Sequence, residues 1–143
     1  MKGGTGLNNK NQLIEEAIKM KDFAYNPYSK FPVGAAVRTA SGKIYTGCNI
    51  ENASYPVTCC AERVAIFKAV SEGEKEFEEM AVAANTKRPV PPCGSCRQVM
   101  AEFFPQDMKI HLTNIHKEIK TVTVGELLPF SFQTEDLHED GVE

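Results

Sequence analysis

Cys60-Ala61-Glu62 and Pro92-Cys93-Gly94-Ser95-Cys96 are the two stretches from which the fold and chemistry of this chain can be worked out. Three cysteine thiolates suffice to hold a zinc ion and leave its fourth coordination position open for water. The carboxylate of Glu62, two residues from a ligand, is placed to handle the protons of that water. An open zinc site beside a carboxylate is typical of a hydrolytic enzyme.

Both stretches stand where the pattern predicts that a helix begins. Cys60 opens one helix, while Cys93 and Cys96 open another with a spacing that lets two sulfurs meet one metal within a single turn. The free N–H groups and positive dipole ends of both helices would then face the metal. Three thiolates with Zn²⁺ leave one net negative charge, which opposes ionisation of a bound water. Arg63 is a candidate counter-charge, through a hydrogen bond to a ligand sulfur.

Two other interpretations of the cysteines stay open at this point. A structural zinc site would need a fourth ligand, and the neighbouring Cys59 is a poor candidate because adjacent residues rarely point at the same metal. A C-x-x-C pair is also a redox motif, although that interpretation leaves Glu62 without a role. We expect Cys48, in the middle of a strand, to be a small buried residue, and Cys59 to be a spectator.

The composition favours one soluble globular domain spanning residues 1–143. The chain is 42% hydrophobic and 24% charged, with a net charge of −3, which argues against a nucleic-acid partner. Apolar runs long enough for a membrane span and a signal-peptide core are absent from the sequence, so we expect a cytoplasmic protein whose cysteines stay reduced. Residues 1–10 are expected to form a flexible leader, and residues 134–143 a loose acidic tail.

Hydrophobic periodicity predicts alternating helices and strands. Helices are expected at residues 11–26, 59–71, 95–104 and 123–128, and strands at 33–39, 44–50, 80–84, 109–113 and 119–122. The first two strands are separated by a short turn around Gly42 and are expected to form a hairpin. Together these elements favour an α/β fold in which one mixed sheet carries helices on both faces.

Beyond the cysteines, residues 13–137 resemble the small bacterial-type cytidine deaminases. The two cysteine stretches match the three-cysteine form of the zinc deaminase signature, in which a glutamate moves the protons. Residues 28–36 (YSKFPVGAA) are similar to the segment that precedes the first strand in that family. Residues 47–55 (GCNIENASY) are similar to its nucleoside-binding segment. Several motifs in the right order make this resemblance more specific than the zinc signature alone.

The resemblance implies a five-stranded mixed sheet in a three-layer α-β-α sandwich, one Zn²⁺ per chain, and homotetramers that share active sites between subunits. It assigns roles to individual residues and selects Cys60 over Cys59 as a ligand. The implied residues are Cys60, Cys93 and Cys96 for zinc, Glu62 for catalysis, Arg63 for charge compensation, and Phe31, Asn49, Glu51, Ala61, Pro91 and Phe132 for the substrate. Phe132 matches an aromatic residue that the family lends to a neighbouring subunit. By the pattern alone, Phe31 and Phe132 would be ordinary core or interface residues.

The implied activity is zinc-dependent hydrolytic deamination of cytidine and deoxycytidine, with release of ammonia, in pyrimidine salvage. Three other functions would account for part of this set of residues. A deaminase for another aminopyrimidine, such as a nucleoside antibiotic, would share the zinc site. A zinc-stabilised interaction module would have no use for Glu62, and a sequestering protein would bind cytidine without converting it.

Overall fold

Five strands form one mixed sheet, whose spatial order is β2-β1-β3-β4-β5. The computed structural model describes residues 6–137. In chain order the strands are β1 (Val33–Thr39), β2 (Ile44–Cys48), β3 (Phe77–Ala84), β4 (Lys109–Thr113) and β5 (Ile119–Thr123). β3 and β4 pair in parallel, and the other neighbours pair antiparallel. The predicted five-stranded mixed sheet and the β1–β2 hairpin are confirmed.

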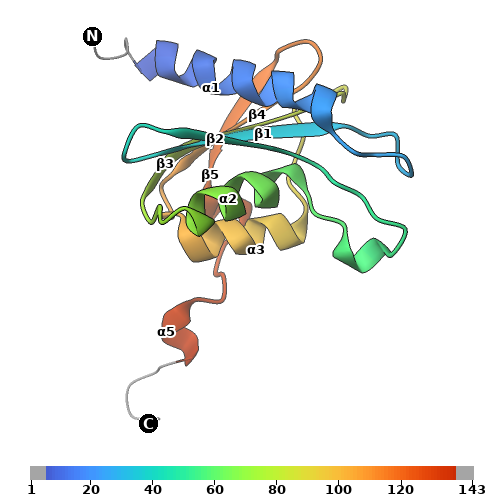
Figure 1. Cartoon of the computed structure of the whole chain (residues 1–143). Helices are drawn as coiled ribbons and strands as arrows, with labels where there is room; N and C mark the ends of the chain where they lie inside the picture. The colour runs from blue at the N-terminus through green and yellow to red at the C-terminus, as the bar shows by residue number, and fades with distance from the viewer. Residues whose placement is uncertain (1–5, 138–143) are drawn as a thin grey trace.

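Helices cover both faces of this sheet (Figure 1). On one face lies α1 (Gly6–Met20), and on the other lie α2 (Ala61–Ser71) and α3 (Gly94–Phe103). The shorter helical segments are η1 (Lys21–Phe23), η2 (Tyr55–Val57), α4 (Val124–Leu127) and α5 (Thr134–Leu137). Among residues 6–137, no helix is long and apolar enough to cross a membrane. The three-layer α-β-α sandwich is confirmed.

The central strands β1 and β3 divide their side chains between two cores. Because successive side chains of a strand point to opposite faces, alternate residues pack under different helices. The larger core, beneath α2 and α3, takes Val33, Ala35, Val37, Met80, Val82 and Ala84 from these strands. The smaller core takes Ala36, Ala81 and Ala83, which pack against Leu13, Ile14 and Ala17 of α1. Small side chains on that face let α1 lie close to the sheet.

Two glycines permit the closest approaches between helix and sheet. A Cβ at Gly34 would lie 2.0 Å from the carbonyl oxygen of Ala17 in α1. A Cβ at Gly47 would lie 2.6 Å from both the carbonyl oxygen of Ala61 and the amide nitrogen of Ala65 in α2. Real Cβ atoms do not come so near to backbone atoms, so both helices depend on a bare backbone beneath them. Gly47 thereby sets the position of the helix that begins next to Cys60.

The expectation that residues 1–10 form a flexible leader is wrong for residues 6–10. The first helix begins at Gly6 and ends at Met20, so residues 6–10 are helical and do not form a leader. The polar residues at this end carry no apolar periodicity, which is why the sequence pattern missed them. A long-range contact fastens this end, because Arg38 Nη2 donates to the carbonyl oxygen of Asn9 at 2.7 Å. Residues 1–5 lie outside the described part of the chain.

Other element bounds differ by a few residues. β2 ends at Cys48, because Asn49 turns inward, and Ile50 instead makes isolated bridges with Tyr25 and Cys59. β3 begins at Phe77, three residues before the expected start. Residues 134–137 of the expected loose tail form the short helix α5, while residues 138–143 lie outside the described residues.

A row of polar side chains crosses the α1 face of the sheet from β1 to β5. Arg38 Nη1 lies 2.8 Å from Glu79 Oε1, and Glu79 Oε2 lies 3.0 Å from His111 Nε2. The Nδ1 atom of His111 contacts the hydroxyl of Thr121 at 2.8 Å. Burial lowers the pKa of His111, which favours its neutral form. This histidine, which no motif explained, therefore has a structural role in linking the strands.

Candidate active site

The three predicted zinc ligands come from the beginnings of α2 and α3. Cys60 and Cys93 are the N-cap residues of these helices, and both have extended backbones, with φ −72° and ψ 155° for Cys60. Cys96 lies in the first turn of α3 and is fully buried. N-cap positions project their side chains beyond the helix end, where unpaired N–H groups gather. The two helix N-termini therefore meet with their positive ends beside the sulfurs.

The sulfur atoms have the spacing of a tetrahedral zinc site. All three lie within 4.8 Å of one another, with 3.7 Å between Cys60 and Cys93 and 3.4 Å between Cys93 and Cys96. Zn–S bonds of about 2.3 Å in a tetrahedral shell separate two sulfurs by about 3.8 Å. None of the three is oxidised to a disulfide. The donor set therefore fits zinc, and it includes Cys60 and not Cys59.

Arg63 lies one helical turn beyond Cys60 and contacts its sulfur. Its Nη2 donates to Cys60 Sγ at 3.2 Å, and its Nε is buried without an acceptor among the described residues. The pKa of the Cys60 thiol falls to about 5, first through hydrogen bonding with Cys96 and then through the guanidinium of Arg63. The hydrogen bond with Cys60, followed by burial, raises the pKa of Cys96. The arrangement favours negative charge on the Cys60 sulfur, as a zinc ligand requires.

Glu62 faces a cavity of about 230 Å³ that also reaches Cys60 and Cys93. The side chain is only 5% exposed, because α2 packs this part of its surface towards the sheet. Burial raises the pKa of Glu62 to about 7. A carboxyl group with such a pKa can both accept and donate a proton at neutral pH.

Asn49 lines the same cavity and holds the loop that carries Phe31. Its Nδ2 donates to the carbonyl oxygen of Phe31 at 2.9 Å, and its Oδ1 accepts from the N–H of Val33 at 2.9 Å. The buried amide thus bonds both ends of a two-peptide segment. An asparagine amide has a second N–H and a second acceptor position, which stay available to a ligand.

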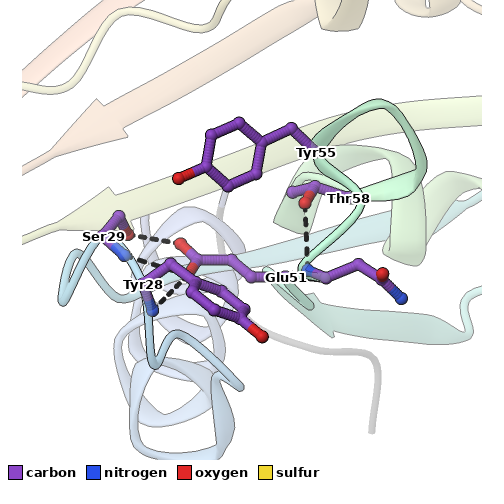
Figure 2. Close-up of a pocket in the computed structure, with 6 residues that line it drawn as sticks. Tyr28, Ser29, Glu51, Tyr55 and Thr58 are labelled. Carbon is purple, nitrogen blue, oxygen red and sulfur yellow. Dashed lines mark hydrogen bonds between the residues drawn. The ribbon is translucent and has the colours of Figure 1, made fainter.

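Glu51 lies where this cavity meets a second one of about 390 Å³ (Figure 2). Its Oε1 accepts the backbone N–H groups of Tyr28 and Ser29 at 3.0 Å each, and its Oε2 accepts the hydroxyl of Ser29. The hydroxyl of Ser29 is the main cause that lowers the pKa of Glu51. The two cavities share Ser29, Glu51 and Thr58. Tyr28 and Tyr55 form the walls on the outer side, with ring centroids 6.4 Å apart.

The structure brings most of the predicted site residues to one place. The cavity beside the cysteines is lined by Phe31, Asn49, Glu51, Ala61, Glu62 and Pro91. Ala61 is the first residue of α2, and its N–H therefore has no acceptor within the helix. Cys48 is buried, as expected, and its thiol donates to the carbonyl oxygen of Phe23.

Phe132 is not brought to this cavity. It is 58% exposed and lies beside Phe130 on the C-terminal segment, which extends away from the three layers (Figure 1). Sequence reasoning in turn missed Ser29 and Thr58, which line both cavities. The available signal was weak: a small hydroxyl residue in a loop between aromatic residues, where such side chains often bond the nearby backbone.

Three thiols at two helix N-termini, with a buried carboxylate in the adjoining cavity, define the class of zinc-dependent deaminases. Residues 7–112 match the family model described as "Cytidine and deoxycytidylate deaminase zinc-binding region". The chain belongs to this family, and Cys60, Cys93 and Cys96 are the group positioned to hold its zinc ion.

Individual relatives agree with this assignment. A cytidine deaminase of Halalkalibacterium halodurans is 55% identical over 127 residues, which cover 89% of this chain and 96% of the relative. A crystal structure of cytidine deaminase from Burkholderia pseudomallei superposes with a TM-score of 0.83 at 45% identity, over 85% of this chain and 98% of that one. A blasticidin-S deaminase of Bacillus cereus is more distant, at 34% identity over 85% of this chain and 90% of the relative.

Proposed function

We propose that this zinc enzyme removes the amino group of cytidine, and of deoxycytidine, by hydrolysis. The products are uridine or deoxyuridine and ammonia. The observation that carries the proposal is the cavity in which Glu62 and two of the zinc-binding cysteines stand beside Asn49 and Glu51. The zinc-binding cysteines and Glu62 therefore line the same cavity as Asn49 and Glu51, whose polar side chains are suited to bind a sugar. The relatives named as cytidine deaminases support the choice of base. We assign the reaction to pyrimidine salvage as part of the same proposal.

The proton transfers are assigned to Glu62. A zinc ion held by the three cysteines supplies a Lewis acid that makes water nucleophilic at neutral pH. Glu62 takes one proton from the attacking water and passes it to N3 of the pyrimidine. It then takes the second proton of that water, from the hydroxyl now on C4, and passes it to the amino group, so that ammonia leaves as the C4 carbonyl forms. One carboxyl group can act as base and then as acid because burial holds its pKa at about 7. Arg63 offsets the negative charge of the three thiolates.

The remaining residues would bind and orient the nucleoside. Phe31 would supply an aromatic surface to the base, and the backbone N–H of Ala61 and the carbonyl oxygen of Pro91 would contact the pyrimidine. All three residues line the cavity, which supports these roles. Asn49 and Glu51 retain hydrogen-bonding capacity for the ribose hydroxyls. Fixing the sugar aligns C4 before the reaction begins, which removes an entropic cost from the chemical step.

The assembly and location of the enzyme belong to the same proposal. We place Phe132 in the active site of a neighbouring subunit within a homotetramer, which its exposure on the C-terminal segment supports. A zinc site built from three free thiols needs a reducing compartment, so we assign the protein to the cytoplasm. One sheet unites both cysteine-bearing helices, which supports a single domain.

The test is to follow the ultraviolet change of cytidine with the zinc-loaded protein and with Glu62→Gln. We expect conversion to uridine by the unmodified protein, one zinc per chain in both proteins, and a loss of about 10²-fold or more in kcat for the variant. Glu76→Gln, on the exposed surface, is the control for removing a carboxylate. Near-normal kcat in a zinc-loaded Glu62→Gln would overturn the assignment of Glu62.

The substrate itself is tested with the same preparations. Deoxycytidine and blasticidin S are offered in parallel with cytidine. Faster turnover of blasticidin S than of cytidine would move the activity to the rival aminopyrimidine class and leave the zinc site standing.

A further inference from the structure

Ser29 makes more contacts at the active-site rim than its place in an exposed loop would suggest. Its hydroxyl donates to Glu51 Oε2 and accepts the backbone N–H of Phe31 at 3.0 Å. Its own N–H donates to Glu51 Oε1 at 3.0 Å. The side chain also borders both cavities. None of the roles assigned so far accounts for this residue.

These bonds close a ring through the three residues proposed to bind the nucleoside. Phe31 is held at its N–H by the hydroxyl of Ser29 and at its carbonyl oxygen by the amide of Asn49. Glu51 is held by Ser29, and it follows Asn49 after one residue, Ile50, whose backbone is fixed to Cys59 in both directions at 2.9 Å. The hydroxyl of Ser29 is therefore the side-chain link between the aromatic residue proposed for the base and the carboxylate proposed for the sugar.

The link to Ser29 limits how Glu51 can accept further hydrogen bonds. An ionised carboxylate offers about four acceptor positions, and loop donors occupy three of them here. Two of these bonds, from Tyr28 and Ser29 N–H groups, hold Oε1. The hydroxyl of Ser29 holds Oε2 and so fixes the rotation of the carboxylate plane. Figure 2 shows these bonds from Tyr28 and Ser29 to Glu51. The one acceptor position that remains, on Oε2, is then held in a fixed direction, in which it can accept a bond from a sugar hydroxyl.

We infer that Ser29 is a positioning residue, which orients the carboxylate of Glu51 towards the 2′- and 3′-hydroxyl positions of the bound sugar and thereby favours cytidine over its 2′,3′-dideoxy analogue. This inference rests on the proposed nucleoside deamination. Ser29 touches no reacting atom, so its contribution concerns binding of the sugar and not the chemical step. The hydroxyl acts through Glu51, which sets the two residues apart from Glu62 and the cysteines.

The test compares Ser29→Ala with the unmodified enzyme on cytidine and on 2′,3′-dideoxycytidine. We expect Ser29→Ala to raise KM for cytidine about tenfold with kcat nearly unchanged, because a hydrogen bond to a charged group has been removed. On the dideoxy substrate the same variant should change kcat/KM less than twofold, since neither the 2′- nor the 3′-hydroxyl is left to donate a hydrogen bond to Glu51. Ser29→Thr, which keeps a hydroxyl, should restore most of the cytidine KM. Ser41→Ala removes another serine-to-glutamate bond, to Glu74 at 3.0 Å, far from the site, and is the matched control.

A double-mutant comparison with Glu51→Gln completes the test. Adding Ser29→Ala to Glu51→Gln should produce little further loss on cytidine. Equal losses on both substrates, or additive losses in the double variant, would overturn the inference, because Ser29 would then act through the loop and not through Glu51. If neither Ser29→Ala nor Glu51→Gln reduces the preference for cytidine over 2′,3′-dideoxycytidine, both the sugar-binding role of Glu51 and this inference are overturned. If the unmodified enzyme leaves cytidine unchanged, the proposed function fails first, and that result is read from the parent protein alone.

Discussion

At the scale of single residues, the backbone decides which of two adjacent cysteines becomes a zinc ligand. Cys59 exchanges hydrogen bonds of 2.9 Å with Ile50 in both directions, so its backbone is extended and paired. Cys60 follows as the N-cap of α2. Successive side chains of an extended backbone point in opposite directions, so a ligand at Cys60 excludes its neighbour. Glu62 then falls in the first turn of the helix, close to the metal but outside its ligand set.

Arg63→Gln tests whether the guanidinium is needed to hold zinc on three thiolates. We expect zinc affinity or kcat to fall by about tenfold or more, because the partner of the Cys60 sulfur is lost and the negative charge of the site is less well balanced. Zinc transfer to a chromogenic chelator measures the affinity. Lys75→Gln removes a positive charge from an exposed position and should change neither quantity. Unchanged affinity and rate in Arg63→Gln would mean that the two helix N-termini suffice.

At the scale of elements, the site depends on how closely α2 approaches β2. Gly47 lies directly beneath the first turns of α2, where its missing Cβ leaves room for the Ala61 and Ala65 backbone. Cys60 and Glu62 both lie at that end of the helix. A shift of α2 away from the sheet would therefore move a zinc-binding cysteine together with the carboxylate to which we assign the proton transfers.

Gly47→Ala tests this coupling between packing and chemistry. The added methyl group meets backbone atoms that cannot rotate away, so we expect a destabilisation of about 1–3 kcal/mol with a fall in kcat. Urea unfolding and the cytidine assay measure the two effects. Gly125→Ala, in α4, is the matched control, because its Cβ would lie 3.4 Å from the nearest atom and alanine favours a helix. Equal behaviour of the two variants would contradict the role given to Gly47.

At the scale of the whole molecule, the C-terminal segment leaves the layered body and carries exposed apolar side chains. Phe130, Phe132 and Leu137 are each more than half exposed. The carbonyl oxygen of Phe132 accepts a bond from Gln98 Nε2 at 3.2 Å, so the segment is tied to α3 where it departs. Exposed apolar residues on a projecting segment favour contact with another subunit.

Subunit mixing tests the proposal that Phe132 completes a neighbour's active site. Phe132→Ala should raise KM for cytidine, and Phe130→Ala on the same segment serves as its control. Co-expressed Phe132→Ala and Glu62→Gln subunits should recover activity, because some sites then combine an intact Glu62 with an intact Phe132 from the neighbour. Light scattering checks that the mixed assemblies form. Activity no higher than that of the separate variants, in assemblies of normal size, would place Phe132 outside the neighbouring site.

Much of the fold was predictable from local pattern. The strands at residues 33–39 and 109–113 have the bounds expected from runs of apolar and β-branched residues. The start of α1 was not predictable, because the contact from Arg38 to Asn9 joins residues far apart in the chain. The inward turn of Asn49, which ends β2, likewise depends on acceptors and donors in the loop at Phe31 and Val33.

The sequence by itself determined the ligand types and the carboxylate beside them, because the residue types and the short spacings within Cys60-Ala61-Glu62 and Cys93-Gly94-Ser95-Cys96 are properties of the chain itself. The further motifs at residues 28–36 and 47–55 indicated the family. Only the tertiary structure decided that Cys60, Glu62 and Cys93 share a cavity with Asn49 and Glu51, and that the hydroxyl of Ser29 bonds the carboxylate of Glu51 at its rim. Those relations join loops that no periodicity connects. They arise because the sheet brings the end of β2 and the starts of α2 and α3 to the same place.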